Sequence, residues 1–163
     1  MRRVFLYIIV AAILILTGLL PLRGTDVAQL LPVQVMLVER EDGLVRIRCD
    51  HGAAGSGENW EQALQDLRAS AEGEVFFGTV EHVVLAKSAG YLMPRIAASA
   101  DLRPAAKLYF AQKSLPEPEQ AAAFLHAHPG SLTLGGIRAA LLAGEPAVPP
   151  QIICKEGRLL LAG

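Results

Sequence analysis

The sequence of 163 residues contains few of the patterns that usually mark a chemical function. Its two cysteines are too few for a zinc site built from cysteine alone or for a framework of disulfides. The 15 Lys and Arg residues nearly balance the 16 Asp and Glu residues, and no basic run exceeds two residues, which argues against non-specific nucleic-acid binding. With 52% hydrophobic and 19% charged residues, the chain has the composition of one folded domain of ordinary size.

The longest uncharged stretch lies at the N-terminus, where residues 4–22 contain no charged side chain. As a helix this stretch would be about 28 Å long, close to the hydrocarbon core of a bilayer. Two arginines precede it, and the positive-inside rule then favours a cytoplasmic N-terminus with residues 24–163 outside. We predict that residues 1–23 form a signal anchor, a single transmembrane helix.

Two other interpretations of this segment are less favoured. A buried core helix rarely follows a basic cap at the extreme N-terminus. A cleaved signal peptide usually has a shorter apolar run and a small-x-small cleavage site, which residues 20–23 do not supply. Leu16-Thr17-Gly18 resembles the start of a lipoprotein signal, but Leu19 stands where the lipidated cysteine must be. The outer part has a net charge of −4, so the helix rather than a basic patch would hold it at the membrane.

The pattern of residues 24–163 predicts one domain of class α/β or α+β, with helices packed on a mixed β-sheet. The predicted order is ββαβαβααββ. We expect strands over residues 33–39, 44–49, 79–87, 105–111, 151–154 and 158–161, and helices over residues 57–70, 88–99, 116–126 and 131–142.

Local signals support several of these elements. The Asp42-Gly43 pair suits the turn of a β-hairpin between the first two strands. Trp60 leads a row of apolar residues at helical spacing, so we expect its ring to be buried. Pro94 would fall inside the helix predicted over residues 88–99, which should therefore be short or broken.

One glycine-rich stretch has the spacing of a phosphate-binding loop. Gly52 and Gly57 match the two glycines of that motif, but Glu58 stands where the lysine should be and would repel phosphate. We interpret the stretch as a plain loop between hairpin and helix.

The metal-ligating residue types are scattered. The four histidines are His51, His82, His126 and His128. The last two are two positions apart and cannot share a helix face, so no metal site is predicted. Cys49 and Cys154 fall on predicted strands, which suits two buried apolar residues or a disulfide that closes a long loop.

No pattern typical of catalysis is found either. None of the six serines lies in a G-x-S-x-G motif, and no carboxylate pair occupies an apolar setting. These serines are Ser56, Ser70, Ser88, Ser99, Ser114 and Ser131. We expect no enzyme activity, no catalytic, cofactor-binding or metal-binding residues, and no cofactor.

Five stretches together suggest a family. They are residues 25–38, 57–63, 76–89 and 101–111, and the pair 150–154 and 159–163. Their order and spacing resemble the N-terminal domain of the Ger(x)C family, the lipoprotein subunits of spore germinant receptors. The sequence differs from the family pattern in two ways. Leu19 stands where the family has the lipid-bearing cysteine. Family members also continue into further domains, so we expect a stand-alone first domain here.

The resemblance implies a role without catalysis. We expect a membrane-anchored interaction or scaffold subunit, related to spore germination or sporulation, which contacts other membrane proteins such as germinant-receptor subunits. Its expected location is a membrane, with residues 24–163 outside the cytoplasm, and a link to germination would make this the spore inner membrane. The alternatives are an extracytoplasmic sensor of a small ligand, with a pocket between sheet and helices, and a hydrolase with dispersed residues.

Overall fold

The computed structural model describes residue 7, residues 30–155 and residues 157–162. The predicted anchor, residues 1–23, lies outside this part except for Tyr7. No helix among the described residues combines the length and the apolar character needed to cross a bilayer.

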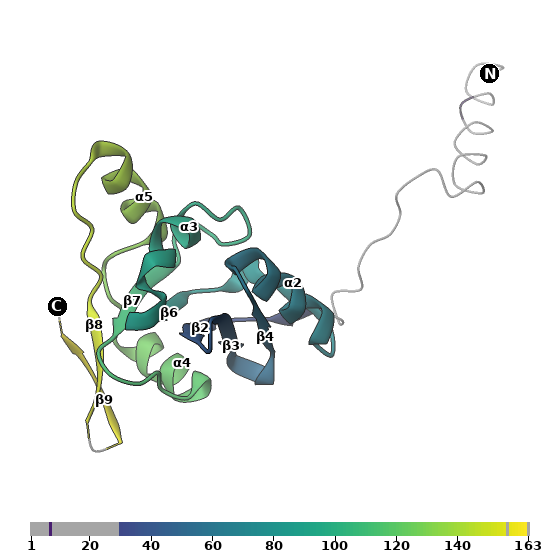
Figure 1. Cartoon of the computed structure of the whole chain (residues 1–163), viewed down its shortest axis with the longest axis horizontal. Helices are drawn as coiled ribbons and strands as arrows, with labels where there is room; N and C mark the ends of the chain where they lie inside the picture. The colour runs from purple at the N-terminus through teal and green to yellow at the C-terminus, as the bar shows by residue number, and fades with distance from the viewer. Residues whose placement is uncertain (1–6, 8–29, 156, 163) are drawn as a thin grey trace. The chain divides into compact units, whose positions relative to one another are not determined.

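A seven-stranded mixed sheet organises the domain (Figure 1). Its spatial order is β4-β3-β2-β6-β7-β8-β9, with β2, β6, β7 and β8 parallel to one another and the other three antiparallel to their neighbours. The strands are β2 (Val35–Glu41), β3 (Leu44–Cys49), β4 (Ala54–Gly57), β6 (His82–Ala86), β7 (Lys107–Ala111), β8 (Gln151–Lys155) and β9 (Arg158–Ala162). Two short strands, β1 (Leu30–Pro32) and β5 (Glu74–Phe76), pair separately.

Helices supply buried side chains to both faces of this sheet. They are α2 (Trp60–Ser70), α3 (Met93–Ala97), α4 (Pro118–Ala127) and α5 (Leu134–Ala143). Buried residues of α2, α3 and α5 join one core cluster, and those of α4 join the other. The result is a three-layer arrangement of helices, sheet and helices, which confirms the prediction of one α/β domain with a mixed sheet.

The central strands explain this layering. In β2, Met36 and Val38 face the first cluster, while Val35 and Leu37 face the second. All five residues of β6 are likewise buried. Because successive side chains of a strand point to opposite faces, an apolar run without alternation requires cover on both sides.

The glycine-rich stretch was wrongly predicted to be a loop. Residues 54–57 form β4, an edge strand paired with β3. A Cβ atom on Gly55 would lie 2.3 Å from the backbone nitrogen of Leu67, and one on Gly57 would lie 2.5 Å from that of Ala63. The glycines therefore let α2 lie directly against the strand.

Helix starts also differ from the prediction, because capping residues decide them. The side chains of Asn59 and Thr133 accept hydrogen bonds from the first turns of α2 and α5, which therefore begin three residues later than predicted. Pro94 lies in the first turn of α3 rather than in a helix interior, after a 3₁₀ helix over Lys87–Leu92. Gly144 has a φ of 71° and ends α5.

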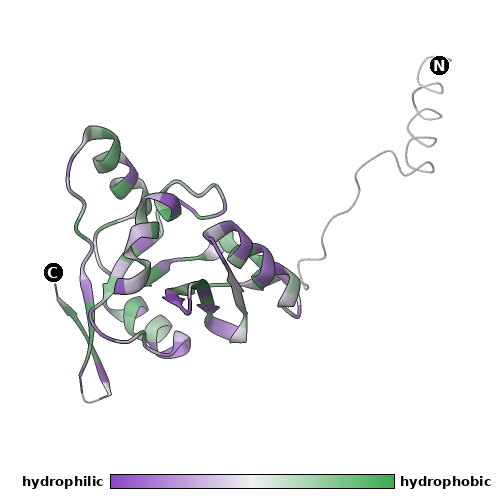
Figure 2. Cartoon of the chain, in the orientation of Figure 1, coloured by the Kyte–Doolittle hydropathy of each residue, from purple (hydrophilic) through white to green (hydrophobic). Residues whose placement is uncertain are grey.

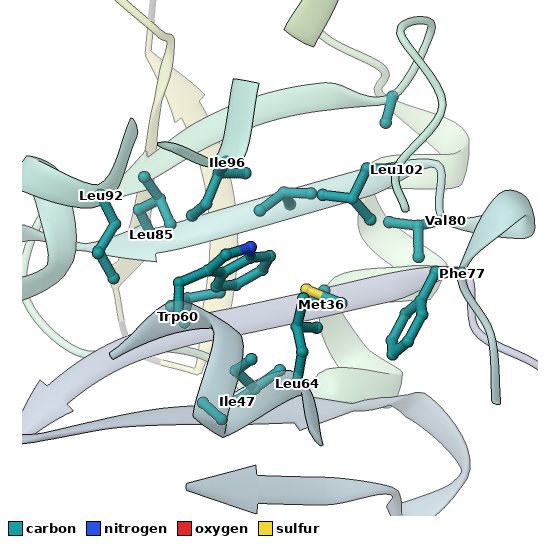
Figure 3. Close-up of a cluster of buried hydrophobic side chains, with 14 of the residues drawn as sticks. Met36, Ile47, Trp60, Leu64, Phe77, Val80, Leu85, Leu92, Ile96 and Leu102 are labelled. Carbon is teal, nitrogen blue, oxygen red and sulfur yellow. The ribbon is translucent and has the colours of Figure 1, made fainter. Parts of the chain in front are cut away.

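The ring of Trp60 is a central part of the first cluster (Figure 3). Only 2% of the residue is exposed, which confirms its predicted burial. We expect Trp60→Ala to lower the free energy of unfolding by about 3–5 kcal/mol, because it leaves a large cavity. Chemical denaturation followed by circular dichroism measures this change, and a near-native value would contradict the packing.

A second prediction concerns the contact between β4 and α2. Gly55→Ala should lower the free energy of unfolding by about 1–3 kcal/mol, because the added methyl group meets helix backbone that cannot rotate away. Its neighbour Ser56 is exposed, so Ser56→Ala is the matched control and should change stability by less than about 0.5 kcal/mol. Equal midpoints for the two variants in thermal unfolding would refute this account.

Candidate functional site

The four histidines lie on three different elements of the structure. His51 lies in an exposed turn after β3, His82 is buried at the start of β6, and His126 and His128 lie exposed at the end of α4. Within residues 30–155 and 157–162, no three His, Cys, Asp or Glu side chains gather closely enough to hold a metal ion.

The two cysteines are both free, and they lie on different parts of the sheet. Cys49 is buried on β3 as predicted, whereas Cys154 is exposed on β8, so the prediction of a second buried cysteine was wrong. Four strand spacings separate β3 from β8, about 19 Å, which is too far for a disulfide. Burial first, and the neighbouring Asp50 second, raise the pKa of the Cys49 thiol to about 12 and keep it protonated.

Four serine hydroxyls hydrogen-bond to backbone or carboxylate groups among the described residues, those of Ser56, Ser70, Ser88 and Ser99. The Ser70 hydroxyl donates to the Ala54 carbonyl at 2.7 Å, and the Ser88 hydroxyl accepts from the Arg40 amide at 3.1 Å. In the described part of the chain, no serine hydroxyl hydrogen-bonds to a histidine ring. These serines therefore fix local structure.

A buried carboxylate that the sequence analysis did not single out fixes the start of β2. Asp50 is 4% exposed, and its oxygens accept hydrogen bonds of 3.0–3.1 Å from the backbone amides of Gln34 and Val35. The carboxylate thereby joins the end of β3 to the beginning of β2. In the sequence, this buried role was marked only by the place of the aspartate directly after a strand, and many exposed turns have an aspartate at the same place.

A second buried polar group links β6, β7 and the loop after α4. The Tyr109 hydroxyl lies 3.2 Å from Nδ1 of His82 and accepts a hydrogen bond of 2.9 Å from the Gly130 amide. Because that amide uses the hydroxyl as an acceptor, the hydroxyl proton is free to point at Nδ1, so the imidazole carries its proton on Nε2. Both side chains of this network are buried, His82 at 4% exposure and Tyr109 at 0%.

The electrostatics keep this network neutral. Burial is the main reason that the pKa of His82 is lowered to about 4. The negative charge of Glu81 opposes this shift, and the nearby positive groups of Lys107, His126 and Arg103 add to it. Burial also raises the pKa of Tyr109, against the effect of the Gly130 amide. Neither side chain is therefore charged near neutral pH.

The surface that stands out is apolar and lies near the C-terminus. Between α5, the proline-rich segment 146–150 and the end of β9 runs a groove of about 760 Å³, which we call the C-terminal groove. Its lining includes Leu132, Ala140, Pro146, Val148, Pro150 and Leu161.

Three large apolar side chains between residues 142 and 160 face solvent, and one of them, Val148, lines the groove. Leu142 on α5 is 83% exposed, Val148 is 79% exposed, and Leu160 on β9 is 51% exposed. Apolar residues make up much of α5 and β9 (Figure 2). Exposed apolar groups of this size beside a groove are typical of surfaces that bind another macromolecule.

A smaller cavity of about 460 Å³ lies at the carboxyl ends of β6 and β7. Lys87, Gln112 and Gln151 supply polar groups, and Phe110 supplies an apolar wall. In open α/β sheets, small ligands bind at this end of the parallel strands. The cavity can therefore accept a small molecule that combines an anionic or amide group with an apolar body.

We expect the neutral His82 to make stability depend on pH. Between pH values of about 6.5 and 4 the unfolded chain binds a proton at this site and the folded chain does not, so stability falls by up to about 3 kcal/mol as the pH drops. His82→Gln has no such proton and should lose less stability over this range. Denaturation curves at several pH values compare the two proteins, and equal slopes would show that His82 does not contribute.

Comparisons with known proteins do not assign a family: no family model, curated protein or solved structure matches the chain. The likeness to Ger(x)C domains therefore depends on the five sequence stretches alone.

Proposed function

We propose that the protein is a non-enzymatic, membrane-anchored interaction subunit related to spore germination or sporulation. The observation that carries this proposal is the apolar C-terminal groove, whose lining residue Val148 is 79% exposed. Such side chains gain free energy when a partner covers them, at about 25 cal/mol for each Å² buried.

The positions of the family-like stretches support the same proposal. They include the first half of β2, the first turn of α2, all of β6 and β7, and nearly all of β8 and β9. The likeness thus extends over five of the seven strands of the sheet rather than one local motif, as expected if it reflects a whole domain.

The N-terminal sequence supplies the proposed location. An anchor over residues 1–23 with two leading arginines would hold residues 24–163 at the outer side of the membrane. A domain held there meets other membrane proteins by lateral diffusion, and an apolar groove then suffices for binding. We propose germinant-receptor-like subunits as these partners and the spore inner membrane as the site.

A second candidate function is the sensing of a small extracytoplasmic ligand. The observation that favours it is the cavity beside Phe110, which is also lined by Lys87 and two glutamines. Its volume falls within the usual range for small-molecule sites. A ligand that raises the melting temperature of the wild-type protein, but not that of Gln112→Ala, would favour this candidate.

Affinity capture tests the first proposal. The tagged full-length protein, recovered in mild detergent from its native cell through sporulation, should sediment with membranes and bring down transporter-like germination subunits. Val148→Arg places a charge in the lining of the C-terminal groove and should abolish this capture, because the charge would lose its hydration in the complex.

A matched variant controls for general effects of the charge. Gln65→Arg adds the same charge to an exposed position of α2, and it should leave the capture unchanged. Recovery of the wild-type protein alone, from vegetative membranes, would refute the germination role and bring the ligand sensor forward.

A further inference from the structure

The two edge strands of the sheet, β4 and β9, differ in their protection against pairing with another chain. Among the described residues, no strand pairs with the outer edge of β4 or of β9. β4 is four residues long, and its side chains are no larger than that of serine. β9 carries three consecutive leucines, 159–161, without a charge or a proline among them. Natural edge strands are usually protected by charges, prolines or bulges, and this stretch of β9 has none of them.

The hairpin geometry determines which backbone groups of β9 are free. Lys155 and Arg158 pair across the two-residue turn between β8 and β9. The pair that closes such a turn is a hydrogen-bonded one, and the pairs alternate along the hairpin. We therefore expect the amides and carbonyls of Leu159 and Leu161 to point away from β8, toward the open edge.

We propose that β9 pairs antiparallel with β9 of a second copy of this chain, about a two-fold axis at Leu160. This pairing goes beyond the proposed function, because it needs neither a membrane nor a germination subunit. It would join two seven-stranded sheets into one continuous sheet.

The side-chain order of β9 is what favours a second copy. The two-fold axis sets Leu160 opposite the partner's Leu160, and Leu159 opposite the partner's Leu161. Arg158 then lies opposite the partner's Ala162, so the two arginines occupy opposite ends of the interface and no like charges meet. Cross-strand leucine pairs fill both faces of the junction. The strand is thus complementary to itself in apolar character and in charge.

Two faces of the hairpin contribute to the junction. Leu160 shares a face with Ile153, its partner on β8, and is half-exposed there. Leu159 and Leu161 face the opposite side, where they join the second core cluster. Pairing would therefore extend that cluster across the interface and remove the Leu160 side chain from water.

Five residues from each copy make a small interface, below the roughly 1,200 Å² typical of stable complexes. We therefore expect a dimer that dissociates on dilution. Anchoring both copies in one membrane would raise their effective concentration and favour pairing.

Cysteine cross-linking of the full-length protein in detergent tests the pairing. In a Cys154→Ser background, Leu160→Cys should form a disulfide-linked dimer on mild oxidation, because cysteines opposite each other in a non-hydrogen-bonded pair lie within disulfide distance. Leu142→Cys is the control: it is more exposed than Leu160, so random collision would cross-link it at least as well. Equal or greater cross-linking of the Leu142→Cys protein would overturn the proposal.

A second variant separates pairing through β9 from other association. Leu160→Arg sets two like charges opposite each other at the axis and should abolish the concentration-dependent dimer seen by analytical ultracentrifugation. Circular dichroism checks that the variant is folded. A wild-type monomer at every concentration, or a dimer that survives in the Leu160→Arg protein, would refute pairing through β9. Either result leaves the capture of membrane partners as a separate question.

Discussion

Strands β2 and β6 lie at the centre of the sheet, and side chains on both of their faces are buried. Water must therefore be excluded from two sides at once, which one layer of helices cannot do. The chain meets this constraint by sending α2, α3 and α5 to one face and α4 to the other. Two buried polar groups support the same centre: Asp50 holds the start of β2, and the His82–Tyr109 pair joins β6 to β7.

Strands and helices with strong periodicity could be predicted from the sequence. The strand over residues 44–49 was predicted with its observed bounds, and the burial of Trp60 followed from helical spacing. β4 could not be predicted, because its four small residues have no apolar alternation and form a strand through tertiary contacts, pairing with β3 and packing against α2. Local pattern also does not reveal which face of β8 is covered, so the exposure of Cys154 was missed.

The candidate surface was harder to predict than the fold. Leu142, Val148 and Leu160 have the same apolar character as core residues, and only the tertiary structure shows that nothing among the described residues covers them. The C-terminal groove joins residues that are separated in the sequence, 129–132, Ala140, 146–151 and 161–162, so no spacing rule could identify it. The sequence showed that it contains no familiar catalytic motif, but it did not show the position of the candidate interaction surface.

The two edges of the sheet connect fold to function. At β4, close approach of α2 requires glycine, and the resulting short strand offers little apolar surface to another chain. At β9, leucines continue to the outermost strand, although a solitary soluble domain would gain solubility from a lysine there. An exposed apolar edge promotes aggregation unless a specific partner covers it. In the interaction subunit that we propose, partners would cover this edge and the apolar groove beside it, and the membrane anchor proposed for residues 1–23 would limit the set of partners that reach them.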